Sequence, residues 1–178
     1  MLLRMKRFFT ILSVDDSTGQ SLLQEAVIRT ETPFHIQPFF SPEAALTYLR
    51  GEPPFDNRKI YPFPSLILCN DDLKSSEDDS GVSGNGSDVV ARIRTISSCA
   101  GLPIIMLGES DCWEAGAGHF LHKPTSPTGL GIFVQSLYAC TTSAPLVSTA
   151  SVGKKDDHIQ LAHAKWKNLD SKAKAPSV

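Results

Sequence analysis

The nine residues SLILCNDDL, at positions 65–73, decide how this 178-residue chain folds. Residues 66–69 form a short apolar run, which is typical of a strand that is buried on both faces of a parallel sheet. An amide and two carboxylates follow directly, in the order Asn70, Asp71 and Asp72. Polar side chains at the end of such a strand indicate a site at the edge of the sheet, because the functional crevice of α/β folds lies outside the carboxyl ends of the strands.

Apolar runs of the same kind lie on both sides of this stretch, and helical patterns separate them. Strands are predicted over residues 8–14, 34–40, 66–69, 103–107 and 119–121. Helices are predicted over residues 22–30, 42–50, 89–96 and 127–140. This alternation predicts βαβ units with right-handed crossovers, and therefore an α/β doubly wound parallel sheet. Five polar or small residues that follow predicted strands should then meet at one edge: Asp15, Asp16, Asn70, Gly108 and Lys123.

The charge distribution and the cysteine spacing indicate a cytoplasmic protein that does not bind nucleic acid. Residues 1–150 carry 11 Lys and Arg against 16 Asp and Glu, whereas residues 151–178 carry 6 against 3. An acidic body with a mildly basic tail does not favour nucleic-acid binding, which needs a concentrated basic face. The four cysteines form no CxxC pair, as expected of reduced thiols in a cytoplasmic protein. The apolar stretch near the N-terminus contains Arg4, Lys6 and Arg7, so it is not the span of roughly 20 apolar residues that a membrane helix needs.

Four motifs, in this order and in this α/β frame, resemble a response-regulator receiver domain of two-component signalling: ILSVDD, PSLILCNDDL, LPIIMLGES and EAGAGHFLHKP. The resemblance covers residues 8–140. It implies a flavodoxin-like (βα)5 fold with the strand order 2-1-3-4-5. The segment YLRGEPPFDNRKIYPFP, residues 48–64, also resembles a connection in small stand-alone regulators that partner phytochrome-like kinases.

The resemblance implies a role for each residue at the predicted edge. Asp15 and Asp16 match the acidic pair that holds Mg²⁺ in the family. Lys123 matches the lysine that pairs with the phosphoryl group, and its bond to Pro124 is a candidate cis peptide. Phe120 falls at the position of the rotating aromatic. In the family an Asp at the end of the third strand accepts the phosphoryl group, and a Ser or Thr after the fourth strand senses it.

Two of these positions depart from the family. Asn70 stands where the phosphoacceptor is expected, and Gly108 stands where the Ser or Thr is expected. A neutral amide is a poor nucleophile, and its lower charge weakens Mg²⁺ binding at Asp15 and Asp16 or abolishes it. Without a hydroxyl at Gly108, coupling between the site and the rest of the domain should be lost.

An acceptor one or two residues further along the chain is an alternative. Asp71 faces the other side of the strand unless the strand ends early or bulges, because successive side chains alternate. Asp72 regains the facing but lies about 6–7 Å further along an extended chain.

The segments between the motifs also differ from the family. Residues 74–87 form a polar, Gly/Ser-rich loop that is longer than expected. Residues 109–122 leave room for about one turn where a fourth helix belongs, so that helix should be shortened and the usual receiver dimer face disrupted. Residues 1–143 should form the receiver-like domain. Residues 144–178 should form a linker and basic tail, with room for one short helix over 158–169.

The main hypothesis is an atypical receiver domain that acts as a phosphorylation-independent interaction module in a phosphorelay-type pathway and is not an enzyme. Its partner would be a histidine kinase or another signalling protein. The alternative is a phosphoacceptor that uses Asp71 or Asp72 with Mg²⁺. A small α/β enzyme based on Asp15, Asp16 and Lys123 is disfavoured, because no nucleophile–base pair accompanies them.

Overall fold

The computed structural model describes residues 9–73, 85–108 and 118–143. These residues contain five strands and four helices, with one 3₁₀ turn at Ser97–Cys99. The strands are β1 (Phe9–Val14), β2 (Phe34–Phe39), β3 (Leu66–Asn70), β4 (Ile104–Gly108) and β5 (His119–His122). The helices are α1 (Ser17–Arg29), α2 (Pro42–Arg50), α3 (Gly86–Arg94) and α4 (Pro127–Ser143).

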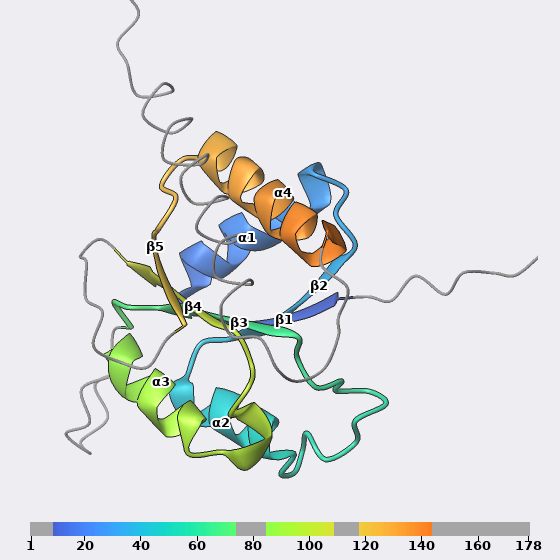
Figure 1. Ribbon diagram of the computed structural model, residues 1–178, viewed down its shortest axis with the longest axis vertical. Helices are drawn as coiled ribbons and strands as arrows, with labels where there is room; N and C mark the ends of the chain where they lie inside the picture. Colours follow the sequence, from blue (N-terminus) through green and yellow to red (C-terminus); the bar gives the residue numbers. More distant parts are fainter. Residues whose placement is uncertain (1–8, 74–84, 109–117, 144–178) are drawn as a thin grey trace, which may run out of the picture. The chain divides into compact units, whose positions relative to one another are not determined.

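All five strands lie in one parallel sheet in the order β2-β1-β3-β4-β5, which confirms the predicted flavodoxin-like α/β fold (Figure 1). Each neighbouring pair is parallel, so the carboxyl ends of the strands share one edge. Strand β3 is buried along its whole length. This burial explains why its sequence is continuously apolar up to Asn70.

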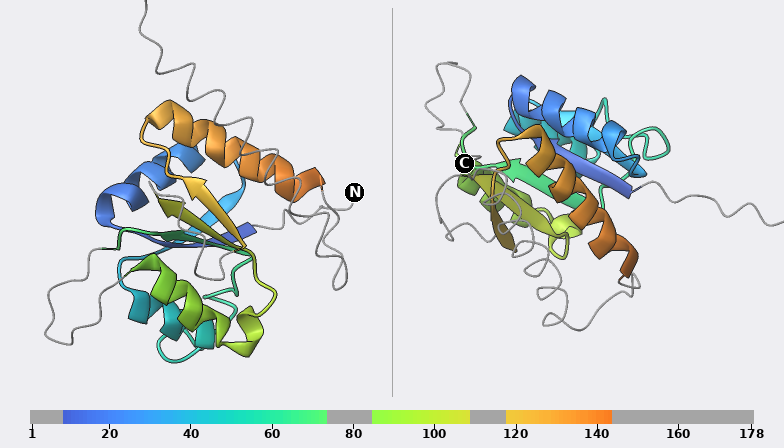
Figure 2. Two further views of the ribbon diagram at one scale, coloured as in Figure 1. Left: turned by 60° about the vertical axis from the view of Figure 1, so that its left-hand side comes forward. Right: turned by 90° about the horizontal axis from the view of Figure 1, so that it is seen from above.

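The chain divides into two compact units. The first contains residues 1–21 and 33–123, and therefore the whole sheet with α2 and α3. These two helices lie on the same side of the sheet (Figures 1 and 2). The core between them and the strands includes Leu12, Val14, Ile67, Cys69, Ile104, Met106, Leu46, Leu49, Val90 and Ile93.

The second unit contains residues 22–32 and 124–178, and therefore most of α1 together with α4. The Arg29 guanidinium donates to the Pro127 carbonyl oxygen at 3.2 Å and so links the two helices. Helix α4 buries Leu130, Phe133, Val134 and Leu137, at the spacing of one helical face. No helix among residues 9–73, 85–108 and 118–143 is long and apolar enough to cross a membrane.

The ends of the helices follow from local chemistry. The Ser41 hydroxyl accepts from the Ala44 amide and so caps the start of α2. Gly51 ends α2 in the left-handed region at φ 70°. Helix α3 begins three residues earlier than predicted, because the Asn85 side chain caps it by accepting from the Ser87 amide.

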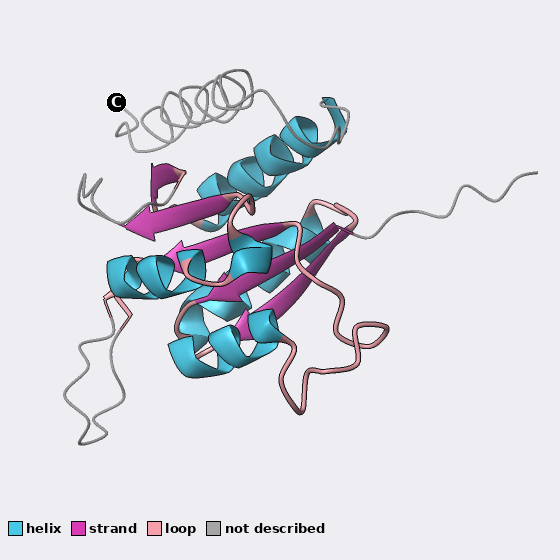
Figure 3. Ribbon diagram, turned by 60° about the horizontal axis from the view of Figure 1, so that its bottom comes forward, coloured by secondary structure: helices cyan, strands magenta, loops and turns pink. Residues whose placement is uncertain are grey.

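Residues 51–65 form the connection from α2 to β3 (Figure 3). An aromatic cluster fixes it, in which Tyr48 packs against Phe55 and Tyr61, and the Tyr48 hydroxyl donates to the Pro62 carbonyl. The prediction of a cis bond at Lys123–Pro124 is wrong: in the described part of the chain the cis bond joins Pro53 and Pro54. A proline can adopt either isomer at modest cost, so the sequence alone did not identify which one is cis.

Three predictions concern segments outside the described residues. They are the long polar loop, most of which lies within 74–84, the shortened fourth helix, which falls in 109–117, and the linker with its basic tail, residues 144–178.

Candidate functional site

The carboxyl edge of the sheet brings together three of the residues that the sequence singled out. Asp15 follows β1, Asn70 ends β3 and Lys123 follows β5. The backbone ladder places them, since the Asp15 amide donates to Phe39 at 3.2 Å and the Lys123 amide donates to Gly108 at 3.0 Å. The Asp15 side chain contacts those of Asn70 and Lys123, although 108 positions of sequence separate Asp15 from Lys123.

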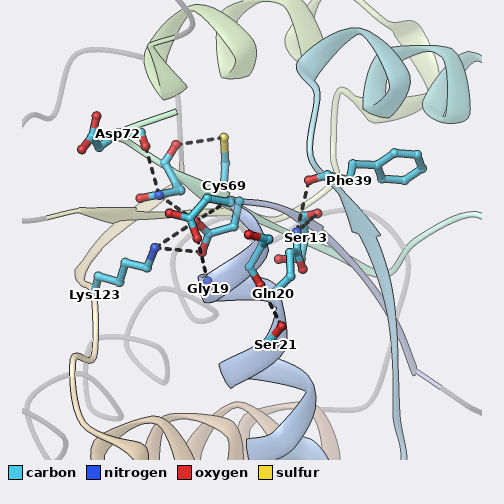
Figure 4. Close-up of polar contacts among 12 residues, drawn as sticks. Ser13, Gly19, Gln20, Ser21, Phe39, Cys69, Asp72 and Lys123 are labelled. Atoms are coloured by element: carbon cyan, nitrogen blue, oxygen red, sulfur yellow. Dashed lines mark hydrogen bonds and ion pairs between the residues drawn. The ribbon is translucent and has the colours of Figure 1, made fainter. Parts of the chain in front are cut away.

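Asp15 is the centre of this cluster. Its side chain is buried, and its Oδ1 accepts from the Asn70 Nδ2 at 2.7 Å, from the Lys123 ammonium at 2.9 Å and from the Asp16 amide at 2.8 Å. Its Oδ2 lies 2.9 Å from the same ammonium (Figure 4). A buried carboxylate is stable only when it is paired and hydrogen-bonded, and these contacts meet that need.

Asn70 is buried with its amide turned toward Asp15. The same Nδ2 also donates to the backbone oxygen of Asp72 at 3.2 Å (Figure 4). Both contacts need an N–H donor, because the acceptors are a carboxylate and a carbonyl. A carboxylate at this position would face Asp15 with no proton to share, so the amide is what allows the two side chains to touch.

Asp16 follows Asp15 directly, but its side chain bonds to the first turn of α1. It is exposed, and its Oδ1 accepts from the Gly19 amide at 2.7 Å. This is the hydrogen bond of an N-cap residue, and it satisfies one of the free amides at the start of α1. The predicted metal ligand Asp16 therefore has a structural role in this arrangement.

In the described part of the chain, the side chains of Asp71 and Asp72 make no hydrogen bond or ion pair with Asp15 or Lys123. The Asp71 backbone continues the ladder of the sheet, donating to Leu107 at 2.8 Å and accepting from Gly86 at 3.0 Å. The Asp71 Cβ lies beside Gly108, where it would be 2.8 Å from a Cβ on that residue. Asp72 is exposed, and it meets Asn70 through its backbone oxygen.

Two residues of the site were missed by sequence reasoning. Gly19 lies against the Asp15 carboxylate so closely that a Cβ there would be 2.1 Å from Oδ2. Gln20 is buried, and its Nε2 donates to the Ser13 and Phe39 carbonyls at 2.8 and 3.1 Å, which ties the first turn of α1 to the ends of β1 and β2. The only available signal was the position of both residues one turn after the acidic pair.

Cys69, directly before Asn70, is not a nucleophile. Burial of its thiol, together with the smaller effect of the nearby negative charges of Asp15 and Asp71, raises its pKa to about 12. At this pKa the thiol stays protonated at neutral pH, and it is unreactive because the thiolate is the nucleophilic form.

The contacts of the acidic pair bear on its capacity for Mg²⁺. This ion prefers six oxygen ligands in near-ideal octahedral geometry. The Asp15 oxygens instead face three N–H groups and the Gly19 backbone, and the capping bond to Gly19 takes up an oxygen of Asp16. Among the described residues no group of three or more His, Cys, Asp and Glu side chains is placed to hold a metal.

The sequence matches no protein-family model and no curated protein at a significant level. Solved structures do resemble it. A response regulator in red light signaling of R. palustris is 21% identical with a TM-score of 0.67, covering 80% of this chain and 100% of its own. A phosphorylated cyanobacterial phytochrome response regulator is 21% identical with a TM-score of 0.64, covering 79% and 99%. An Mn²⁺-bound response regulator is 20% identical with a TM-score of 0.59, covering 80% and 99%.

Proposed function

We propose that this chain, which has the fold of a response-regulator receiver domain, is a two-component signalling module that works by binding a partner and accepts no phosphoryl group. The observation that carries this proposal is the hydrogen bond from the Asn70 amide to the Asp15 carboxylate at 2.7 Å. The amide stands where a receiver needs its nucleophile, and it serves there as a donor within a closed cluster.

The state of Lys123 supports the same proposal. Phosphoryl transfer depends on positioned positive charge that neutralises the oxygens of the transferred group. The Lys123 ammonium lies 2.9 Å from each oxygen of Asp15, and its side chain is 28% exposed against 8% for Asp15. Its charge is therefore already compensated within the protein.

We also infer that the acidic pair does not hold Mg²⁺. The contacts of Asp15 are with nitrogen donors, and binding of a divalent cation would require the Lys123 ammonium and the Asn70 amide to withdraw. One oxygen of Asp16 is already engaged in the capping bond from the Gly19 amide. The Mn²⁺-bound regulator with a similar fold thus differs from what we propose here.

The alternative is a phosphoacceptor at Asp71 or Asp72 with Mg²⁺ and a histidine kinase as donor. The half-buried Asp71 carboxylate favours it, because no described residue pairs with that side chain. Against it, the Asp71 Cβ lies beside Gly108, and among the described residues no hydrogen bond or ion pair joins the Asp71 side chain to Asp15 or Lys123. The Asp72 backbone is held by the Asn70 amide while its side chain lies in solvent.

The partner is proposed to be a histidine kinase or another signalling protein, with binding in place of covalent modification as the input. This proposal is supported by the similarity to two response regulators, one in red light signaling and one of a cyanobacterial phytochrome. In such a scheme the module changes the state of its partner by differential affinity, and no chemical step of its own is needed.

Incubation with acetyl phosphate and Mg²⁺, followed by intact-mass spectrometry, tests the proposal. The wild-type protein should gain no phosphoryl mass, and neither should Asp71→Asn or Asp72→Asn. A conventional receiver treated in parallel checks the reagent. Stoichiometric label on the wild type that disappears in Asp71→Asn or in Asp72→Asn would establish the alternative and end the main proposal.

A further inference from the structure

Gly108, the last residue of β4, has no room for a side chain, because neighbouring residues occupy the space beside its Cα. An ideal Cβ on Gly108 would lie 2.8 Å from the Asp71 Cβ, 2.9 Å from the Phe120 Cζ and 3.2 Å from the Phe120 Cε2. Real Cβ atoms essentially never approach other heavy atoms within 3.0 Å. Any side chain at position 108 would therefore have to displace the ring, the Asp71 side chain or both.

The backbone at Gly108 does not itself require glycine. In the described part of the chain the glycine with positive φ is Gly51, at 70°. Gly108 belongs to the regular ladder of β4, where it pairs with His122 across the sheet. An alanine would have the same backbone conformation without strain, so the neighbours alone account for the glycine.

Other contacts fix both of the residues that occupy this space, Asp71 and Phe120. The Asp71 backbone is fixed by hydrogen bonds to Leu107 and Gly86. Phe120 pairs with Met106 in the sheet, and its ring packs against the buried cluster that contains Met106 and Cys69. The ring tip enters the space beside the Gly108 Cα because nothing projects from that residue.

We propose that Gly108 locks the Phe120 ring in a single inward position, so that the β4–β5 edge has one conformation regardless of the state of the crevice. The signalling meaning of this lock rests on the proposed function, since a module that accepts no phosphoryl group needs no moving aromatic. The lock itself is a matter of packing, and its test involves no phosphorylation.

The first experiment inserts the missing methyl group. Gly108→Ala should lower the thermal unfolding midpoint by roughly 3–10 °C, as overpacking of a filled site does. It should also shift the Phe120 ring resonance in protein labelled with ring-¹³C phenylalanine, the signal being assigned by its loss in Phe120→Leu. Gly101→Ala is the matched control, because a Cβ there meets nothing within 4 Å.

Double variants assign the cause, and they remain informative if Gly108→Ala does not fold. Adding Phe120→Leu, which removes the ring tip, should recover at least half of the loss caused by Gly108→Ala. Adding Asp71→Gly should recover less. An unchanged Phe120 resonance in Gly108→Ala, a midpoint equal to that of Gly101→Ala, or recovery through Asp71→Gly alone would each overturn the lock. None of these results depends on whether acetyl phosphate labels the protein, so the lock and the proposed function can fail separately.

Discussion

At the scale of single residues, the site is organised by what Asp15 touches. An amide at position 70 and an ammonium at position 123 both donate to its carboxylate, and Gly19 leaves room for it against α1. The result is a buried charge whose partners are all supplied by the protein. Removal of one member of such a buried pair is costly, because it leaves the other member as an uncompensated buried charge.

Replacement of Lys123 tests the importance of this pairing. Lys123→Met should lower the free energy of unfolding by about 2–3 kcal/mol, because it leaves the 8%-exposed Asp15 without its counter-charge. Arg92→Met is the matched control: Arg92 lies at the same 2.9 Å from Glu43, but that pair is exposed, and its loss should cost at most about 0.5 kcal/mol.

Denaturant unfolding of both variants measures the two values. Adding Asp15→Asn to Lys123→Met should restore part of the loss, since the uncompensated charge is then gone. Equal losses in the free energy of unfolding for Lys123→Met and Arg92→Met would mean that the buried ion pair stabilises the fold no more than the exposed one.

At the scale of elements, the acidic pair divides into two roles. Asp15 belongs to the charged cluster, whereas Asp16 caps α1 through the Gly19 amide. The pair looked like one metal site in the sequence because adjacency along the chain does not reveal which way each carboxylate turns. The loop before α1 turns them apart.

Two substitutions of Asp16 distinguish a cap from a metal ligand. Asp16→Asn should change the free energy of unfolding by less than about 0.5 kcal/mol, because Asn is an equally good N-cap. Asp16→Ala should lower it by about 1 kcal/mol, the usual cost of losing a cap. Denaturant unfolding with and without EDTA makes the comparison. Mg²⁺-dependent stability that Asp16→Asn abolishes would establish a ligand role instead.

At the scale of the whole molecule, the sequence predicted the fold because its signals were local and repeated. Apolar runs alternate with helical patterns, and parallel strands necessarily bring their carboxyl ends to one edge. That geometry alone was enough to predict that Asp15, Asn70 and Lys123 would meet.

The details of the site were beyond sequence reasoning because they depend on contacts between distant segments. That Gly19 must be small is a consequence of where the Asp15 carboxylate lies, and that Gly108 must be small is a consequence of Asp71 and Phe120. Neither contact leaves a periodic or spaced pattern in the chain. The sequence likewise shows that residue 70 is an amide but does not predict the direction in which the Asn70 amide points.

¹⁹F NMR of the protein with beryllofluoride and Mg²⁺, which together imitate a phosphorylated aspartate, tests directly whether any carboxylate at this edge of the sheet can carry a phosphoryl group. The closed cluster of Asp15, Asn70 and Lys123 predicts no protein-bound fluoride signal, so that the spectrum of the wild type matches that of Asn70→Ala. A saturable bound signal that is lost on substitution of Asp71 or Asp72 would contradict the account.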